Sequence, residues 1–144
     1  MEHLREYIDY GIVAILGAMS VAALGIVIER LAFMKKVDVS AFGTKQELET
    51  ALTKGLHNIG SIASNAPYIG LLGTVLGIMA TFYTMGNGGM GDVSAVMKGL
   101  SSALFATACG LVVAIPTVYC YNLLIRRSKE KLTEWIGIHG RERD

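Results

Sequence analysis

Two apolar stretches decide the fold of this chain: APYIGLLGTVLGIMATFYTM at residues 66–85 and LSSALFATACGLVVAIPTVYCYNLLI at residues 100–125. Neither stretch contains a charged side chain, and each is long enough to cross the roughly 30 Å hydrocarbon core of a bilayer as a helix. A third apolar stretch, GIVAILGAMSVAALGIVI at residues 11–28, is the shortest of the three. Together they take 64 of the 144 residues and predict three transmembrane helices.

The remaining residues are too few and too scattered to build a soluble core. Hydrophobic residues make up 52% of the sequence and gather in blocks instead of alternating with charged ones. The surface of these blocks must be covered by lipid and by other subunits. We therefore expect an all-α integral membrane protein that forms a homo-oligomer, with long helices that extend into the cytoplasm.

The distribution of lysine and arginine predicts the orientation. Residues 29–65 carry five of them and residues 126–144 carry six, whereas the segment between the second and third spans has only Lys98. By the positive-inside rule, the two basic segments are cytoplasmic and the N-terminus is periplasmic. The chain, residues 1–144, is thus a single domain with spans at 10–30, 66–85 and 100–125, a cytoplasmic helical segment at 31–65, a periplasmic turn at 86–99 and a cytoplasmic tail at 126–144.

The first span is interpreted as a retained anchor. A secretory signal peptide has positive charge before its apolar region, but here Glu2, Glu6 and Asp9 occupy that place. No small-residue cleavage site follows, because the span is succeeded directly by Glu29 and Arg30.

The segment before the second span carries a helix start signal. Thr44 and Glu47 have the spacing of a capping box, so a helix is expected to begin near Thr44. Apolar residues then recur at helical spacing and predict an amphipathic helix that packs on partner helices: Leu48, Leu52, Leu56, Ile59 and Ala63. Pro67 is expected to lie within a long helix that continues into the second span.

Small and hydroxyl residues line one face of each of the two later spans. Projected at the helical period, each set falls within about 80° of arc. In the second span the set is Gly70, Thr74, Gly77, Thr81 and Thr84. In the third span it is Ala103, Thr107, Gly110, Ala114, Thr117 and Tyr121.

Two interpretations fit these faces. In the first, small residues let helices approach closely in lipid and the threonines bond to their own backbone, which suits Gly70, Gly77 and Gly110. In the second, the hydroxyls of Thr74 and Thr107, with Thr81 and Thr117, line a polar pathway for protons. Pro116 within the third span is either a hinge or a tolerated membrane proline.

A proton pathway needs a group that binds and releases a proton. Residues 66–85 and 100–125 contain no Asp, Glu, His or Lys. Any titrating group in the pathway must therefore come from another chain.

The sequence offers nothing for catalysis or for metal and cofactor binding. The histidines His3, His57 and His139 lie outside the spans without ligand-like spacing, and there is no phosphate-binding loop or hydrolase motif. Cys109 and Cys120 are about three helical turns apart and predict no disulfide. The net charge of +1 gives no reason to expect nucleic-acid binding.

The strings APYIGLLGTVLGIM (66–79) and LFATACGLVVAIPTVYCYN (104–122) closely resemble the signature helices of the MotA/TolQ/ExbB proton-channel family. Within this family the chain resembles the ExbB members, and the likeness extends loosely to IERLAF after the first span. The resemblance implies an inner-membrane ring, a pentamer, around the single-span helices of an ExbD-like partner that supplies a transmembrane Asp. Such a complex uses the proton-motive force to energise TonB, which drives uptake across the outer membrane.

The resemblance also assigns residues. The pore threonines of the family map onto Thr74 and Thr107. Many ExbB members carry a Glu shortly before the second threonine, where this chain has Ser102. Two alternatives stay open: TolQ-like service in envelope constriction, and a structural membrane scaffold that conducts nothing.

Overall fold

A computed structural model of the chain describes residues 2–88 and 92–141. Within these residues the structure is helical and has no strand. The elements are α1 (Glu2–Lys36), a short 3-10 helix η1 (Val39–Ala41), α2 (Lys45–Thr53), α3 (Leu56–Gly88) and α4 (Val93–Arg141). The prediction of an all-α fold is confirmed.

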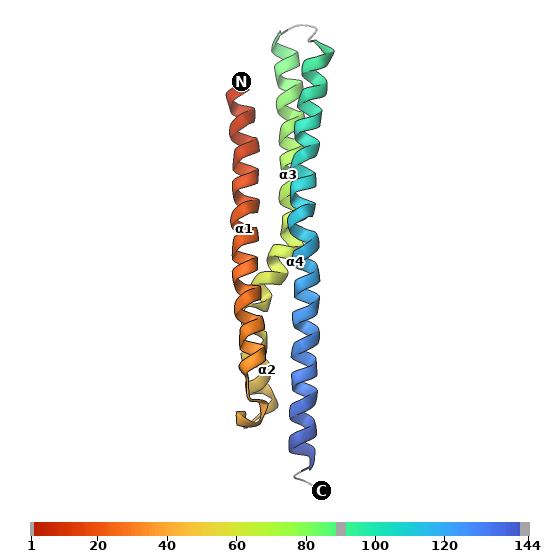
Figure 1. The fold of residues 1–144 in the computed structure, drawn as a ribbon. Coiled ribbons are helices and arrows are strands. Elements are labelled where there is room, and N and C mark those ends of the chain that lie inside the picture. Colours follow the sequence, from red (N-terminus) through yellow and green to blue (C-terminus); the bar gives the residue numbers. More distant parts are fainter. Residues whose placement is uncertain (1, 89–91, 142–144) are drawn as a thin grey trace.

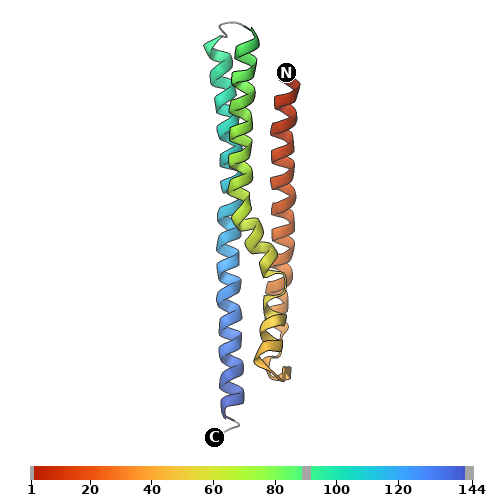
Figure 2. The same ribbon diagram turned by 180° about the vertical axis from the view of Figure 1, so that it is seen from behind.

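Three of the helices, α1, α3 and α4, are long and apolar enough to cross a membrane, as predicted. They lie side by side in an elongated bundle (Figures 1 and 2). The N-terminal end of α1 lies toward the end of the bundle where α3 ends and α4 begins, and α2 lies toward the opposite end, beside the last part of α4 (Figure 1). We call these the turn end and the α2 end.

The start of α2 follows the capping signal. The backbone N–H of Glu47 donates to Thr44 Oγ1 at 3.2 Å, and the helix begins at the next residue after Thr44, as predicted. The helix does not run on into the second span, however, because Gly55 adopts a left-handed φ of 80° and separates α2 from α3. After this break, the apolar face of α2 packs against helices of the same chain. Leu48 and Leu52 are fully buried in a cluster with residues of α1 and α4.

α3 runs through Pro67 as one helix, as expected. The ribbon bends in this region (Figures 1 and 2), since proline cannot donate to the carbonyl one turn earlier. The preceding residues add to this effect, because Ser64 Oγ and Asn65 Nδ2 donate to the backbone carbonyls of Gly60 and Ser61. Because of the bend, the first residues of α3 run in a different direction from the apolar residues that follow Pro67.

Helix occupies much of the segment assigned to the turn between the second and third spans. α3 extends to Gly88 and α4 already begins at Val93, so residues 93–99 are helical. The N–H of Ser94 donates to Asp92 Oδ1 at 3.0 Å and satisfies one free donor at the start of α4. At its other end α4 continues well beyond residue 125, to Arg141.

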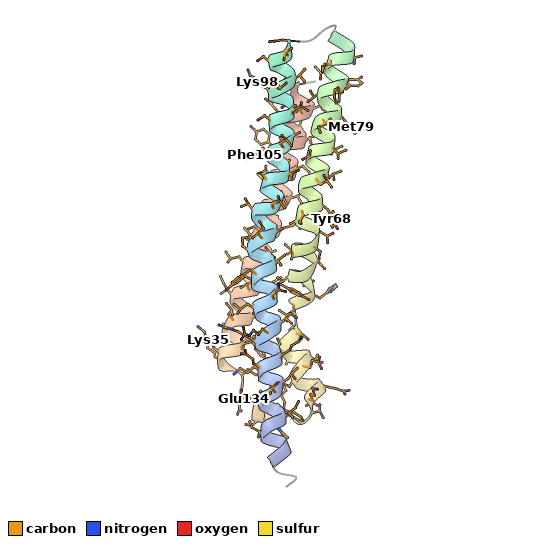
Figure 3. All side chains as sticks on the ribbon, turned by 90° about the vertical axis from the view of Figure 1, so that its right-hand side faces the viewer. Lys35, Tyr68, Met79, Lys98, Phe105 and Glu134 are labelled. Carbon is orange, nitrogen blue, oxygen red and sulfur yellow. The ribbon has the colours of Figure 1, made fainter. Side chains whose placement is uncertain are left out.

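The bundle is thin, so most large apolar side chains lie on its surface. Examples are Tyr68, Met79 and Phe105, which are 68%, 61% and 64% exposed. Figure 3 shows these three residues between Lys98 near the turn end and Lys35 and Glu134 toward the α2 end. A belt of exposed apolar residues between charged ends is the pattern of a membrane protein.

Candidate functional site between α3 and α4

Glycines bring the backbones of α3 and α4 into close contact. A Cβ added at Gly70 would lie 2.8 Å from the carbonyl oxygen of Ala106 and 3.0 Å from Gly110 Cα. A Cβ added at Gly110 would lie 2.7 Å from the carbonyl oxygen of Ala66. Neither position has room for a side chain, so both glycines are needed for the approach of the helices.

Gly77 also lies at the contact of α3 and α4, about two helical turns from Gly70 toward the turn end. A Cβ there would lie 2.8 Å from Ala103 Cβ. The small residues on the predicted face of α3 therefore meet those on the predicted face of α4 within one chain. The two faces are partners of each other, which the sequence did not reveal.

Thr74 and Thr107 meet at this contact. Thr74 Oγ1 donates to the carbonyl of Ala103 at 2.8 Å and is in hydrogen-bond contact with Thr107 Oγ1. If Thr74 donates to Ala103, its hydroxyl oxygen accepts from Thr107, which sets up a short chain of hydroxyls between the helices. Thr74 is 9% exposed and Thr107 is half-buried, so Thr107 is the more open member of the pair.

The other two threonines proposed for the pathway lie apart from this pair. Thr81 Oγ1 donates to the carbonyl of Gly77 at 2.9 Å, and Thr117 Oγ1 donates to the carbonyl of Val113 at 2.6 Å. Both side chains are buried and bond to their own helices. Such bonds satisfy a hydroxyl in apolar surroundings without any water.

α4 runs through Pro116 as one continuous helix. Pro116 and Thr117 line a small cavity of about 150 Å³ between α1 and α4, whose other lining residues are mainly apolar. Pro116 therefore lies on the α1 side of α4.

A cavity with both polar and apolar lining residues lies toward the α2 end of the same helix pair. It has a volume of about 520 Å³, and its lining includes His57, Ser61, Asn65, Tyr121 and Asn122. Tyr121 ends the small-residue face of α4, and a Cβ added at Gly60 of α3 would lie 3.1 Å from its ring. The contact face of α3 and α4 thus borders this cavity at the α2 end.

Two polar contacts at the turn end were not predicted from the sequence. Ser102 Oγ donates to Asp9 Oδ2 at 2.7 Å, and Arg5 Nη2 donates to the carbonyl of Lys98 at 3.0 Å. The sequence did contain a signal for these contacts. Arg5, Asp9 and the buried Ile12 are spaced four and three residues apart, so they lie on the same inner face of α1. What the sequence could not give is the residue of α4 that each would meet.

The described residues contain no group of three or more His, Cys, Asp and Glu side chains placed to hold a metal ion. Cys109 and Cys120 are both free thiols in α4. At the contact of Thr74 and Thr107 the available groups are hydroxyls and backbone carbonyls, which can relay a proton but do not hold one at neutral pH.

Known proteins support a transport role for this architecture. Residues 34–136, which include α2, α3 and most of α4, match the model of the MotA/TolQ/ExbB proton channel family. The chain is 51% identical over 140 residues to the biopolymer transport protein ExbB of Aquifex aeolicus, covering 97% of this chain and 95% of the relative. It is 52% identical over 128 residues to the protein of the same name from Helicobacter pylori strain J99, covering 89% and 88%.

Both relatives align along almost their whole length, so the likeness includes α1 as well as the helices matched by the family. The family is one of membrane channels and not of enzymes. With this match, these two relatives and three helices long enough to span a bilayer, the chain belongs to the MotA/TolQ/ExbB proton channel family.

Proposed function

We propose that the chain is the channel-forming subunit of a complex in the bacterial inner membrane that uses the proton-motive force to energise TonB-dependent uptake across the outer membrane. Several copies, expected to be five, form a ring around the membrane helices of an ExbD-like single-span partner. The observation that carries this proposal is the Thr74–Thr107 hydroxyl pair, which lies within the part of the bundle whose surface is apolar.

The partner is required by the chemistry of the pathway. The apolar part of α3, residues 66–88, contains no Asp, Glu, His, Lys or Arg, and neither does the apolar part of α4, residues 100–125. Hydroxyls stabilise a proton in transit but do not store it, so a carboxylate on the partner helix completes the site. The half-buried Thr107 is the member of the pair that such a carboxylate or its water would reach.

The thin bundle supports the formation of a ring. Large apolar side chains are exposed on every long helix, among them Val21 of α1, Met79 of α3 and Val112 of α4. Lipid covers one part of this surface and neighbouring copies cover the rest. The orientation follows from the charges: the basic segments at 29–65 and 126–144 face the cytoplasm, and the turn end faces the periplasm.

Each proton that moves inward through the membrane potential releases roughly 2.3 kcal/mol per 100 mV. The ring holds the partner's carboxylate against the threonine pair, where protonation removes its charge. The cycle of charging and discharging changes how the partner helix sits in the ring, and this change is transmitted to TonB.

The test is the double substitution Thr74→Val with Thr107→Val, since valine keeps the shape of threonine and lacks the hydroxyl. We expect the complex to assemble and to lose both proton flux in liposomes and TonB-dependent uptake in cells. The control is Thr84→Val, because Thr84 lies on the same helix, is exposed and donates only to the carbonyl of Ala80 among the described contacts. Normal uptake by the double variant would overturn the assignment of the pair to the pathway.

A non-conducting scaffold is the rival function, and one observation favours it. Thr74, Thr81 and Thr117 each donate to a backbone carbonyl, so their hydroxyls are satisfied by packing alone. The scaffold predicts no proton flux from the reconstituted complex and no effect when the partner's Asp is removed. The channel predicts flux that this removal abolishes. Service of a Tol pathway instead of TonB would be recognised by co-purification with TolR-like and TolA-like partners.

A further inference from the structure

Helix α1 supplies a carboxylate to the turn end of α3 and α4. Asp9 Oδ2 accepts a hydrogen bond of 2.7 Å from Ser102 Oγ, and the Asp9 side chain is half-buried. This contact joins residues that are 93 positions apart in the sequence. It brings an acid to helices whose own apolar segments contain none.

Asp9 belongs to the face of α1 that packs into the helix pair. Ile12 and Leu16, which follow it by about one and two turns, are buried at 6% and 2% exposure. A Cβ added at Gly73 of α3 would lie 3.2 Å from Ile12 and 2.8 Å from Ala106 Cβ, so three helices meet there. Asp9 lies one turn beyond this meeting point, on the same face.

The position of Asp9 along the bundle is close to that of the threonine pair. Ser102 lies just inside the apolar segment of α4, which begins at Leu100. Thr107 follows Ser102 by five residues, which is about 7.5 Å along the helix axis. A proton can cover this distance only along hydrogen-bonded water between the helices.

Two charged residues of α1, Arg5 and Glu6, lie within one turn of Asp9 and take different directions. Arg5 is one turn earlier on α1 and donates to the carbonyl of Lys98, whose own side chain is exposed. Glu6 also lies on α1, but its side chain is 67% exposed and pairs with His3 at 3.8 Å. α3 contributes no Asp, Glu, Lys or Arg. Asp9 is therefore an acid directed at the bundle, and Glu6 is an acid directed away from it.

We propose that Asp9 collects protons at the turn end of the pathway and that Ser102 holds its carboxylate in place. This role rests on the function proposed above. The carboxylate takes a proton from the periplasmic water, becomes a neutral acid, and gives the proton to water beside the Thr74–Thr107 pair. From there the proton passes to the partner's carboxylate, and Asp9 returns to its ionised form. Each cycle moves one proton inward and leaves α1 unchanged.

The test measures proton flux through liposomes that hold the complete complex with its partner, with the periplasmic face exposed to solutions of graded acidity. We expect Asp9→Asn to lower the flux by about tenfold near neutral pH, since it removes a proton acceptor and keeps the side-chain shape. The deficit should shrink as the outside solution becomes more acidic, because free protons then replace the collecting group. Asp9→Glu should keep most of the flux, and the matched control Glu6→Gln should keep all of it.

Ser102→Ala is the second variant, because it removes the hydrogen bond without changing any charge. We expect a smaller loss of flux that outside acid also restores, with normal assembly of the complex. Equal flux in Asp9→Asn and the unmodified complex at every acidity overturns the proposal, as does a loss in an assembled complex that acid fails to restore. If Asp9→Asn does not assemble, unchanged flux in Ser102→Ala overturns it.

These outcomes are distinct from a failure of the channel itself. Flux that disappears in the Thr74→Val with Thr107→Val variant but survives Asp9→Asn leaves the channel in place and removes only the role of Asp9. An absence of flux from the unmodified complex overturns both proposals.

Discussion

At the scale of single residues, the contact of α3 and α4 depends on positions where no side chain fits. Gly70 and Gly110 face each other, and at both positions a Cβ would meet backbone atoms of the other helix. Backbone cannot move aside as a flexible side chain can. The hydroxyl pair of Thr74 and Thr107 is held together by this approach, so packing and chemistry depend on the same residues.

We therefore expect Gly110→Ala to separate the helices and destabilise the complex by about 1–3 kcal/mol, the usual effect of overpacking. Thermal unfolding of the purified complex measures this loss, and proton flux should fall with it because the threonine pair is pulled apart. The control is Gly137→Ala, since a Cβ added at Gly137 of α4 has nothing within 4 Å. Equal stability of the Gly110→Ala and unmodified complexes would contradict the close approach of the two helices at this position.

At the scale of the elements, α2 is anchored to α1 by a buried arginine. The Arg30 side chain is only 4% exposed and pairs with Glu29. Its Nη1 donates to the carbonyl of Ala51 at 2.8 Å, and its guanidinium lies 4.6 Å from the centre of the Phe33 ring. Ala51 is in the last turn of α2, where carbonyls lack helical partners and the helix dipole is negative.

Replacing this arginine should release α2. Arg30→Met removes the charge and leaves the Ala51 carbonyl unpaired, at an expected cost of about 1–3 kcal/mol. Hydrogen exchange of the α2 amides should become faster in this variant while exchange in the apolar part of α4 stays slow. Arg30→Lys should give an intermediate effect, because lysine keeps the charge but cannot bond to Glu29 and Ala51 in the same planar geometry.

Exposed Lys35 offers the control for this experiment, since it lies about one turn further along α1. Lys35→Met should leave the exchange of α2 unchanged. Protection of α2 that is the same in Arg30→Met and Lys35→Met would show that the leucine cluster alone holds the helix.

At the scale of the whole molecule, the bundle is incomplete without its surroundings. Its apolar residues are largely exposed, and its charged residues collect toward the two ends (Figure 3). The basic residues of the α2 end are the reason for the orientation proposed above, because moving them across a membrane is costly.

Labelling with a membrane-impermeant thiol reagent tests this orientation. Cys109 and Cys120 are first replaced by alanine, and a single cysteine is then introduced by Asn87→Cys at the turn end or by Gly137→Cys at the α2 end. We expect Asn87→Cys to react in spheroplasts and Gly137→Cys only in inside-out vesicles. The opposite pattern would reverse the proposed topology and with it the direction of proton movement through the chain.

The sequence by itself determined the helical class, the three apolar helices and the start of α2. Each follows from a local cause: an uncharged stretch longer than a bilayer is thick, or the hydroxyl of Thr44 at a free backbone N–H. The periodicity of small residues also marked the faces that carry Thr74 and Thr107. These features are readable because they involve residues within a few turns of one another.

Only the tertiary structure decided what those faces meet. The pairing of Thr74 with Thr107, of Gly70 with Gly110 and of Asp9 with Ser102 depends on the register of separate helices. Register is set by how side chains from all three helices fill the space between them, so no single stretch of sequence contains it. The break at Gly55 had a local signal, because glycine readily adopts the left-handed φ that ends many helices. The burial of the α2 leucines on their own chain, by contrast, depends on how α1, α2 and α4 pack together.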